Sequence, residues 1–138
     1  MTLSPTALVE RLLRAVNAHD LDEVVDCFAE TYRNETPVHP SRGFVGRAQV
    51  RDNWARIFDG VPDVRADVTR MSSDGLVVWS EWEMRGTRRD GVEHLMRGVI
   101  VFGVEDAHLG WARFYLEPVD ESGDTVGEAV ARAVGAPR

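Results

Sequence analysis

Residues 76–104 read LVVWSEWEMRGTRRDGVEHLMRGVIVFGV, and this stretch decides the fold. Two runs rich in Val, Ile, Trp and Phe flank Arg88-Arg89-Asp90-Gly91, a sequence typical of a turn. A connection this short joins antiparallel strands. We therefore predict a long β-hairpin, with strands at Leu76–Arg85 and His94–Val104. One more strand is predicted before the hairpin, at Val64–Met71, and one after it, at Leu109–Leu116.

Helical patterns fill the first half of the chain. Ser4-Pro5 is a typical helix start, and apolar residues recur at helical spacing after it. Asp20 and Glu23 have the spacing of a capping box for a second helix, and Gly46 leads into a third. A short strand is possible from Tyr32 onward. Helices followed by strands predict an α+β fold, with three N-terminal helices packed on a curved antiparallel sheet.

Composition predicts one domain over residues 1–138. Hydrophobic residues make up 43% of the chain, which is enough for a core. The tail after about residue 118 is either a loose final helix or a frayed end. The net charge of −7 repels phosphate backbones and anionic lipids, so we expect no nucleic-acid partner and no membrane partner.

The Cys and His content bounds the chemistry. Cys27 is the one cysteine, so no disulfide can form within the chain. The four histidines lack the spacing of a zinc motif, and we expect no metal and no cofactor. Without a signal-peptide pattern, the expected location is a reducing cytoplasm.

Both faces of the strand Leu76–Arg85 carry apolar residues, which is unusual for an antiparallel sheet with one wet face. The helices can cover one face, and a second copy of the chain is the simplest cover for the other. We therefore expect a homodimer through the outer sheet face. The apolar residues expected on that face are Trp82, Met84, Val99, Val101 and Tyr115.

The ordered set of elements resembles a known superfamily. The resemblance is carried by Asn17–Leu21 through Phe28-Ala29-Glu30, by Gly43–Arg47, and by Glu81–Thr87 through Phe102 to Tyr115-Leu116-Glu117. It covers about Leu8 to Glu117, and over this range the chain resembles the NTF2-like superfamily, with a SnoaL-like domain. Polyketide cyclases, limonene-epoxide hydrolases and ketosteroid isomerases are the relatives. The resemblance implies a cone in which a curved sheet wraps the helices, with a pocket between them and dimerisation through the outer face.

The catalytic residues of these relatives carry over poorly. The epoxide hydrolases use an Asp–Arg–Asp trio with a Tyr and an Asn that hold water. Tyr32 and Asn34 match the water-holding pair and Glu83 falls on one acidic position, but Glu81 replaces the arginine. Arg113 or Phe114 falls on the second aspartate and on the acidic position of the cyclases. Of the three ketosteroid isomerase positions, this chain has Leu12, Ile100 and Asn34.

Glu81 and Glu83 are the sharpest catalytic candidates. Residues two apart on a strand project to the same face, and two carboxylates in a cavity would form an acid–base pair. The alternative is that Trp82 and Met84 point inward. The glutamates would then be solvated on the outside and paired with Arg85 or Arg97.

Other polar residues offer weaker candidates. Tyr32 and Asn34 could fix a water or a carbonyl oxygen at the pocket floor, or could only anchor the loop strand. His39 lies in a Pro-rich loop, where an acid–base role competes with an ordinary surface role. His94 starts a strand, and a surface role is favoured over a place at the pocket mouth.

The hypothesis from sequence is a protein that binds a small apolar molecule, with a possible hydrolase, cyclase or isomerase activity through Glu81 and Glu83. The alternative is a non-catalytic ligand-binding or dimerisation module. The aromatic content suggests a flat apolar ligand. The ligand-binding residues expected to line the pocket are Trp54, Phe58, Trp79, Met96, Ile100 and Phe114, with His39 in the nearby loop.

Overall fold

The computed structural model describes residues 3–137. Within these residues the chain forms four α-helices, six strands and one short 3-10 helix, η1. The helices are α1 (Pro5–Asn17), α2 (Leu21–Asp26), α3 (Arg47–Gly60) and α4 (Val126–Val134), and η1 spans Pro40–Arg42. The strands are β1 (Phe28–Glu35), β2 (Phe44–Val45), β3 (Arg65–Asp74), β4 (Val77–Thr87), β5 (Glu93–Glu105) and β6 (His108–Pro118).

Side-chain caps fix the starts of the first two helices. The Ser4 hydroxyl accepts a hydrogen bond from the Ala7 backbone N–H at 3.2 Å, and Pro5 occupies the first helical turn. Asp20 caps α2 by accepting from the Glu23 N–H at 3.1 Å. Three helices form in the first half of the chain as predicted, and α3 begins directly after Gly46, but β1, η1 and β2 separate α3 from α2 and a fourth helix, α4, follows the sheet.

The sheet is mixed, which corrects the prediction of an antiparallel sheet. Its strand order is β2-β1-β6-β5-β4-β3, and β1 runs parallel to β6. The other pairings are antiparallel. The chain enters the sheet directly after α2, with β1 beside the last strand, β6. After β2, helix α3 carries the chain to the opposite edge of the sheet, where β3 begins. Phe28, two residues after the end of α2, is the first residue of β1.

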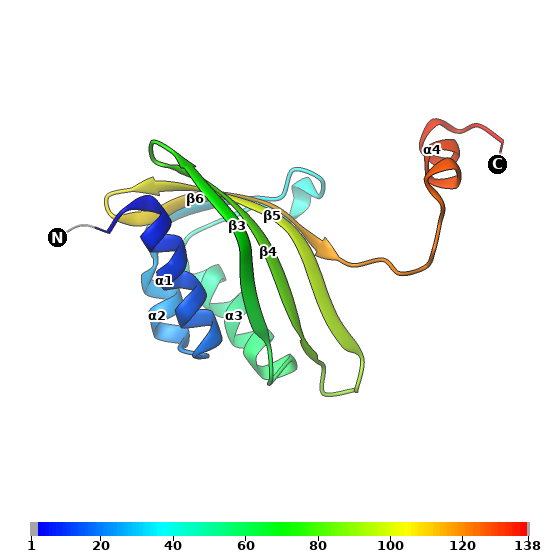
Figure 1. Ribbon diagram of the computed structural model, residues 1–138. Coiled ribbons are helices and arrows are strands. Elements are labelled where there is room, and N and C mark those ends of the chain that lie inside the picture. The colour runs from blue at the N-terminus through cyan, green and yellow to red at the C-terminus, as the bar shows by residue number, and fades with distance from the viewer. Residues whose placement is uncertain (1–2, 138) are drawn as a thin grey trace.

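The curved sheet wraps over α1, α2 and α3, which all lie on its concave side (Figure 1). The core between the two layers contains buried residues from every one of these helices and from the long strands. Asn17 fixes the register of α1 against β3, because its side chain both donates to the Ala66 carbonyl at 2.9 Å and accepts from the Ala66 N–H at 2.8 Å. This packing leaves room under the sheet beside α3.

The final helix α4 stands apart from the body at the end of an extended segment (Figure 1). A capping box between Thr125 and Glu128 starts it, and Gly135 in the left-handed conformation ends it. Its residues are exposed or nearly so, including Val126 at 82% and Val134 at 70%. The tail is therefore helical, which decides between the two alternatives left open by the sequence.

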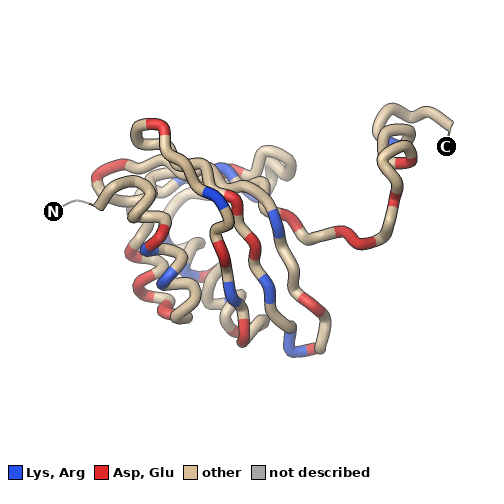
Figure 2. The backbone as a smooth tube through the Cα atoms, viewed as in Figure 1, with Lys and Arg blue, Asp and Glu red and all other residues tan. Residues whose placement is uncertain are grey.

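Within residues 3–137, positively and negatively charged residues are interspersed along the helices and strands (Figure 2). None of the helices within residues 3–137 combines the length and the apolar character needed to cross a membrane. Over the same residues, no cluster of three or more His, Cys, Asp or Glu side chains has the geometry of a metal site. Cys27 is a free thiol, and burial raises its pKa to about 11.

Candidate ligand-binding cavity

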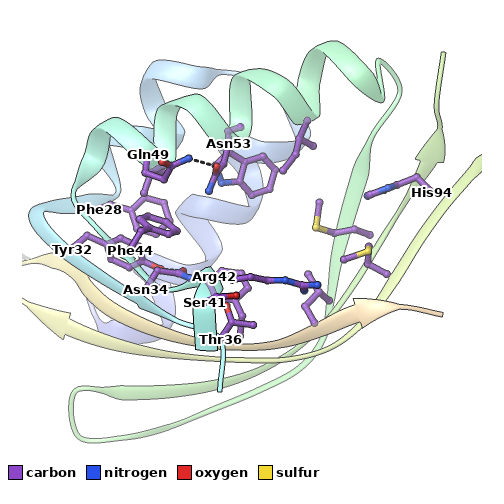
Figure 3. Close-up of a pocket in the computed structure, with 18 residues that line it drawn as sticks. Phe28, Tyr32, Asn34, Thr36, Ser41, Arg42, Phe44, Gln49, Asn53 and His94 are labelled. Atoms are coloured by element: carbon purple, nitrogen blue, oxygen red, sulfur yellow. Dashed lines mark hydrogen bonds between the residues drawn. The ribbon is translucent and has the colours of Figure 1, made fainter. Parts of the chain in front are cut away.

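A cavity of about 590 Å³ lies between α3 and the concave face of the sheet. Its wall is mostly apolar and comes from β1, β2, α3, β4, β5, β6 and the loop before β2 (Figure 3). The lining residues are Phe28, Tyr32, Asn34, Thr36, Ser41, Arg42, Gly43, Phe44, Gln49, Val50, Asn53, Trp54, Ile57, Met84, His94, Met96, Phe114 and Leu116.

Helix α3 supplies one wall because its apolar residues recur at helical spacing. Val50, Trp54 and Ile57 line the cavity, and the polar pair Gln49 and Asn53 lies on the same stripe. The Gln49 amide nitrogen donates to the Asn53 side-chain oxygen at 2.7 Å. Sequence analysis missed this amide pair, although its spacing of four residues places the two side chains next to each other on the helix.

Tyr32 and Asn34 project from β1 into the same wall (Figure 3). Tyr32 is 1% exposed, and its hydroxyl donates to the Asn34 side-chain oxygen at 2.8 Å. Burial raises the pKa of the Tyr32 phenol, so it stays protonated as a donor. Since the Asn34 carbonyl oxygen accepts from Tyr32, the polar group that Asn34 offers to the cavity is its amide N–H₂.

His94 also lines the cavity, in contrast to the surface role that the sequence favoured. It lies near the start of β5, at the opposite end from Tyr32 and Asn34 (Figure 3). Burial lowers the pKa of the imidazole, and the positive charge of Arg88 lowers it further. The ring is therefore neutral near pH 7, with one nitrogen able to donate and the other able to accept.

The expected inward orientation of Glu81 and Glu83 is wrong. Strand β4 pairs with β5 in unbroken register, and it turns Ser80, Trp82 and Met84 toward the helices. Trp82 is 2% exposed, with its indole N–H donating to the Ser80 hydroxyl at 2.8 Å. The Ser80 hydroxyl in turn donates to the Ile100 carbonyl at 2.6 Å.

The two glutamates lie on the convex side of the sheet, as in the alternative weighed from the sequence. Glu83 pairs with Arg97 at 2.7 Å and also with Arg85. Glu81 is exposed and accepts from the Thr69 hydroxyl at 3.0 Å. The physical reason is that an indole gains more from burial than a carboxylate, which would lose its hydration.

Four further predicted lining residues lie outside the cavity wall. Trp79 is 54% exposed on the convex face, and Ile100 is buried in the core. Phe58 packs against His19 instead, with ring centroids 4.8 Å apart. His39 lies on the loop, with its Nε2 atom 2.9 Å from Glu117 Oε1, although the contact lacks hydrogen-bond alignment. The structure does bring together Tyr32, Asn34, Trp54, Met96 and Phe114.

Comparisons with known proteins agree with this fold. The model of a family described as "SnoaL-like domain" matches residues 9–109. A comparison with curated proteins gives no match.

Solved structures with the same fold include an LEH-like epoxide hydrolase of M. tuberculosis, with a TM-score of 0.73, 20% identity and 98% of both chains covered. An epoxide hydrolase/cyclase-like enzyme involved in pyran ring formation in the polyether salinomycin has a TM-score of 0.72 and 22% identity, covering 82% of this chain and 90% of the other. An NTF2-like protein of unknown function from Cytophaga hutchinsonii has a TM-score of 0.65 and 13% identity, covering 86% and 94%.

Proposed function

Because the chain belongs to the SnoaL-like domain family, within the NTF2-like superfamily, we propose that it binds a small, largely apolar molecule in the cavity beside α3. The observation that carries this proposal is the cavity itself, whose volume of about 590 Å³ lies in the range that small-molecule sites occupy. The aromatic rings of Phe44, Trp54 and Phe114 offer flat apolar contacts. The polar groups of Tyr32 and Asn34 offer a place to orient one ligand oxygen.

The lining limits what chemistry the cavity can perform. No Asp or Glu belongs to its wall among residues 3–137, so acid–base work by a carboxylate pair is not part of the proposal. His94 is the lining group that can exchange a proton near neutral pH, since Tyr32 stays protonated. Any reaction in this cavity would therefore use the neutral His94 imidazole as its base. Binding without reaction is the simpler function, because it requires only the apolar and polar contacts that the lining residues provide.

A titration with a neutral, flat probe tests the binding function. Naphthylacetamide is expected to bind one site per chain, with a Kd between about ten micromolar and one millimolar for a ligand of this size. Isothermal titration calorimetry measures the affinity directly. The absence of saturable binding would contradict the proposal.

We also propose that the protein is a homodimer through the convex sheet face, with corrected contact residues. Trp82 and Met84 face the core and cannot take part. Trp79 at 54% exposure and Tyr115 at 41% exposure replace them as the exposed aromatic residues. Val99 lies between these two rings in the register of β4, β5 and β6, whereas Val101 is only 3% exposed within the chain and offers no free surface for the contact. A separate part of the proposal is a cytoplasmic location, where reducing conditions keep the thiol of Cys27 free.

Light scattering at micromolar concentration is expected to give twice the mass of the chain. Trp79→Arg is expected to give a folded monomer, because a charge would be buried without a partner in the middle of the contact. Arg56→Gln, an exposed change on α3, is the control and should stay dimeric. A wild-type monomer at this concentration would contradict the dimer proposal.

A further inference from the structure

The charge of the cavity wall differs from that of the whole chain. The chain contains 23 Asp and Glu residues among 138 and has a net charge of −7. Of the eighteen residues that line the cavity within the described part of the chain, none is acidic. The wall contains one permanent positive charge, Arg42, and one histidine, His94. The lining residues thus carry a positive charge within an acidic molecule, with the Glu117 carboxylate beside Arg42 but outside the lining.

Arg42 lies where the cavity meets solvent. It belongs to η1, it lines the cavity, and its side chain is 59% exposed. Figure 3 shows the long side chain running along the wall, away from the end occupied by Tyr32 and Asn34. An arginine in this place can meet the polar head of a ligand whose apolar body lies deeper, between Trp54 and Phe114.

The Arg42 guanidinium is poorly neutralised by the protein. Its carboxylate neighbour is Glu117, whose Oε2 atom is 3.9 Å from Arg42 Nη1. Other arginines bind carboxylates much more closely, such as Arg33 with Glu105 at 2.9 Å and Arg51 with Asp22 at 2.8 Å. A guanidinium has five N–H donors in a planar fork that matches a carboxylate. Those of Arg42 therefore remain available to a ligand.

Resting on the proposed binding function, we infer that the cavity selects apolar molecules that bear a carboxylate, with the anionic head placed against Arg42 at the mouth. Water competes for an exposed guanidinium, so the gain comes from a charge-assisted, bidentate contact at the edge of a less polar cavity. The neutral ring of His94, which also lines the cavity, can add a hydrogen bond from its N–H. A cationic head would instead meet Arg42 as a like charge.

Three probes that share one ring system test this inference. Naphthylacetate, naphthylacetamide and naphthylethylammonium carry negative, neutral and positive heads on a similar apolar body. Calorimetric titration near neutral pH is expected to give about tenfold tighter binding for the acetate than for the amide. The ammonium is expected to bind most weakly of the three.

The variant Arg42→Gln is expected to remove the preference, so that the acetate and the amide bind with similar affinity. Arg56→Gln is the matched control, because it makes the same change in net charge on an arginine that does not line the cavity. It should keep the tenfold preference.

The outcomes separate the two claims. If the amide binds but the acetate is no tighter, or if Arg42→Gln leaves the preference intact, the inference about the anionic head is overturned and the binding function stands. If Arg56→Gln removes the preference as fully as Arg42→Gln, the effect is long-range and the assigned contact is wrong. If none of the probes binds, the binding function itself fails and the inference fails with it.

Discussion

Trp82→Ala is expected to lower the free energy of unfolding by about 3–5 kcal/mol, the usual cost of removing a buried aromatic side chain. The indole is 2% exposed and packs near Phe102, with ring centroids 6.3 Å apart. Its loss also removes a hydrogen bond to the Ser80 hydroxyl. Since domains of this size are stable by only about 5–15 kcal/mol, this loss is a large fraction of the total stability. Urea denaturation followed by circular dichroism measures the change.

Trp79→Ala is the matched control, because it makes the same substitution on the same strand but on the convex face. Trp79 is 54% exposed, so the variant should fold with a native circular dichroism spectrum. Any loss of stability should depend on protein concentration, since it would come from the proposed dimer contact. A stable Trp82→Ala variant beside an unfolded Trp79→Ala variant would show that β4 presents the opposite face to the helices.

Trp54→Ala is expected to weaken the binding of naphthylacetamide by about tenfold to a hundredfold, which corresponds to the loss of about 1.4–2.7 kcal/mol of aromatic contact. Trp54 lines the cavity from α3 and is only partly buried without ligand. Its removal should therefore cost the fold less than about 1.5 kcal/mol. Calorimetric titration and urea denaturation of the same sample give both values.

Phe58→Ala is the control for this effect, one turn farther along α3. Phe58 stacks on His19 and does not line the cavity. We expect a loss of about 1–3 kcal/mol in the free energy of unfolding, with ligand affinity changed less than threefold. Equal losses of affinity in the two variants would mean that α3 acts on the cavity only through its packing.

Local sequence signals predicted the helices and the hairpin well. Caps such as Ser4-Pro5 and Asp20 act within a few residues, and the structure has them where the sequence indicated. The hairpin of β4 and β5 was also predictable, because the turn Arg88–Gly91 forces antiparallel pairing. The parallel pairing of β1 with β6 joins segments about eighty residues apart, and no local pattern reports it.

The inward face of β4 was the error with the largest consequence for function. Both faces of the strand contain one tryptophan, Trp79 or Trp82, so alternation alone does not decide between them. The decisive feature is Ser80, which supplies an internal partner for the Trp82 indole N–H. A small hydroxyl beside an aromatic residue can satisfy its polar atom in the core, whereas the row with Glu81 and Glu83 would bury two carboxylates without compensation.

The cavity wall was only partly predictable, because some of its residues lie on regular elements and others lie in a loop. Trp54, Met96 and Phe114 lie on periodic elements, and their apolar character indicated the wall. Arg42 reaches the cavity from η1, a short turn in an irregular loop, so its position depends on how the loop closes over the sheet. Tertiary packing brings it there, and no spacing in the sequence encodes it.

The most direct test of the binding cavity is NMR of the methionine methyl groups during titration with naphthylacetamide. Met84 and Met96 line the cavity from β4 and β5, whereas Met71 on β3 does not, so the chain contains its own control. Ring currents from the bound naphthyl group should shift the Met84 and Met96 methyl signals in a saturable manner and leave the Met71 signal in place. A shift at Met71 alone, or no shift at any of the three at saturating probe, would contradict the assignment of this cavity as the ligand site.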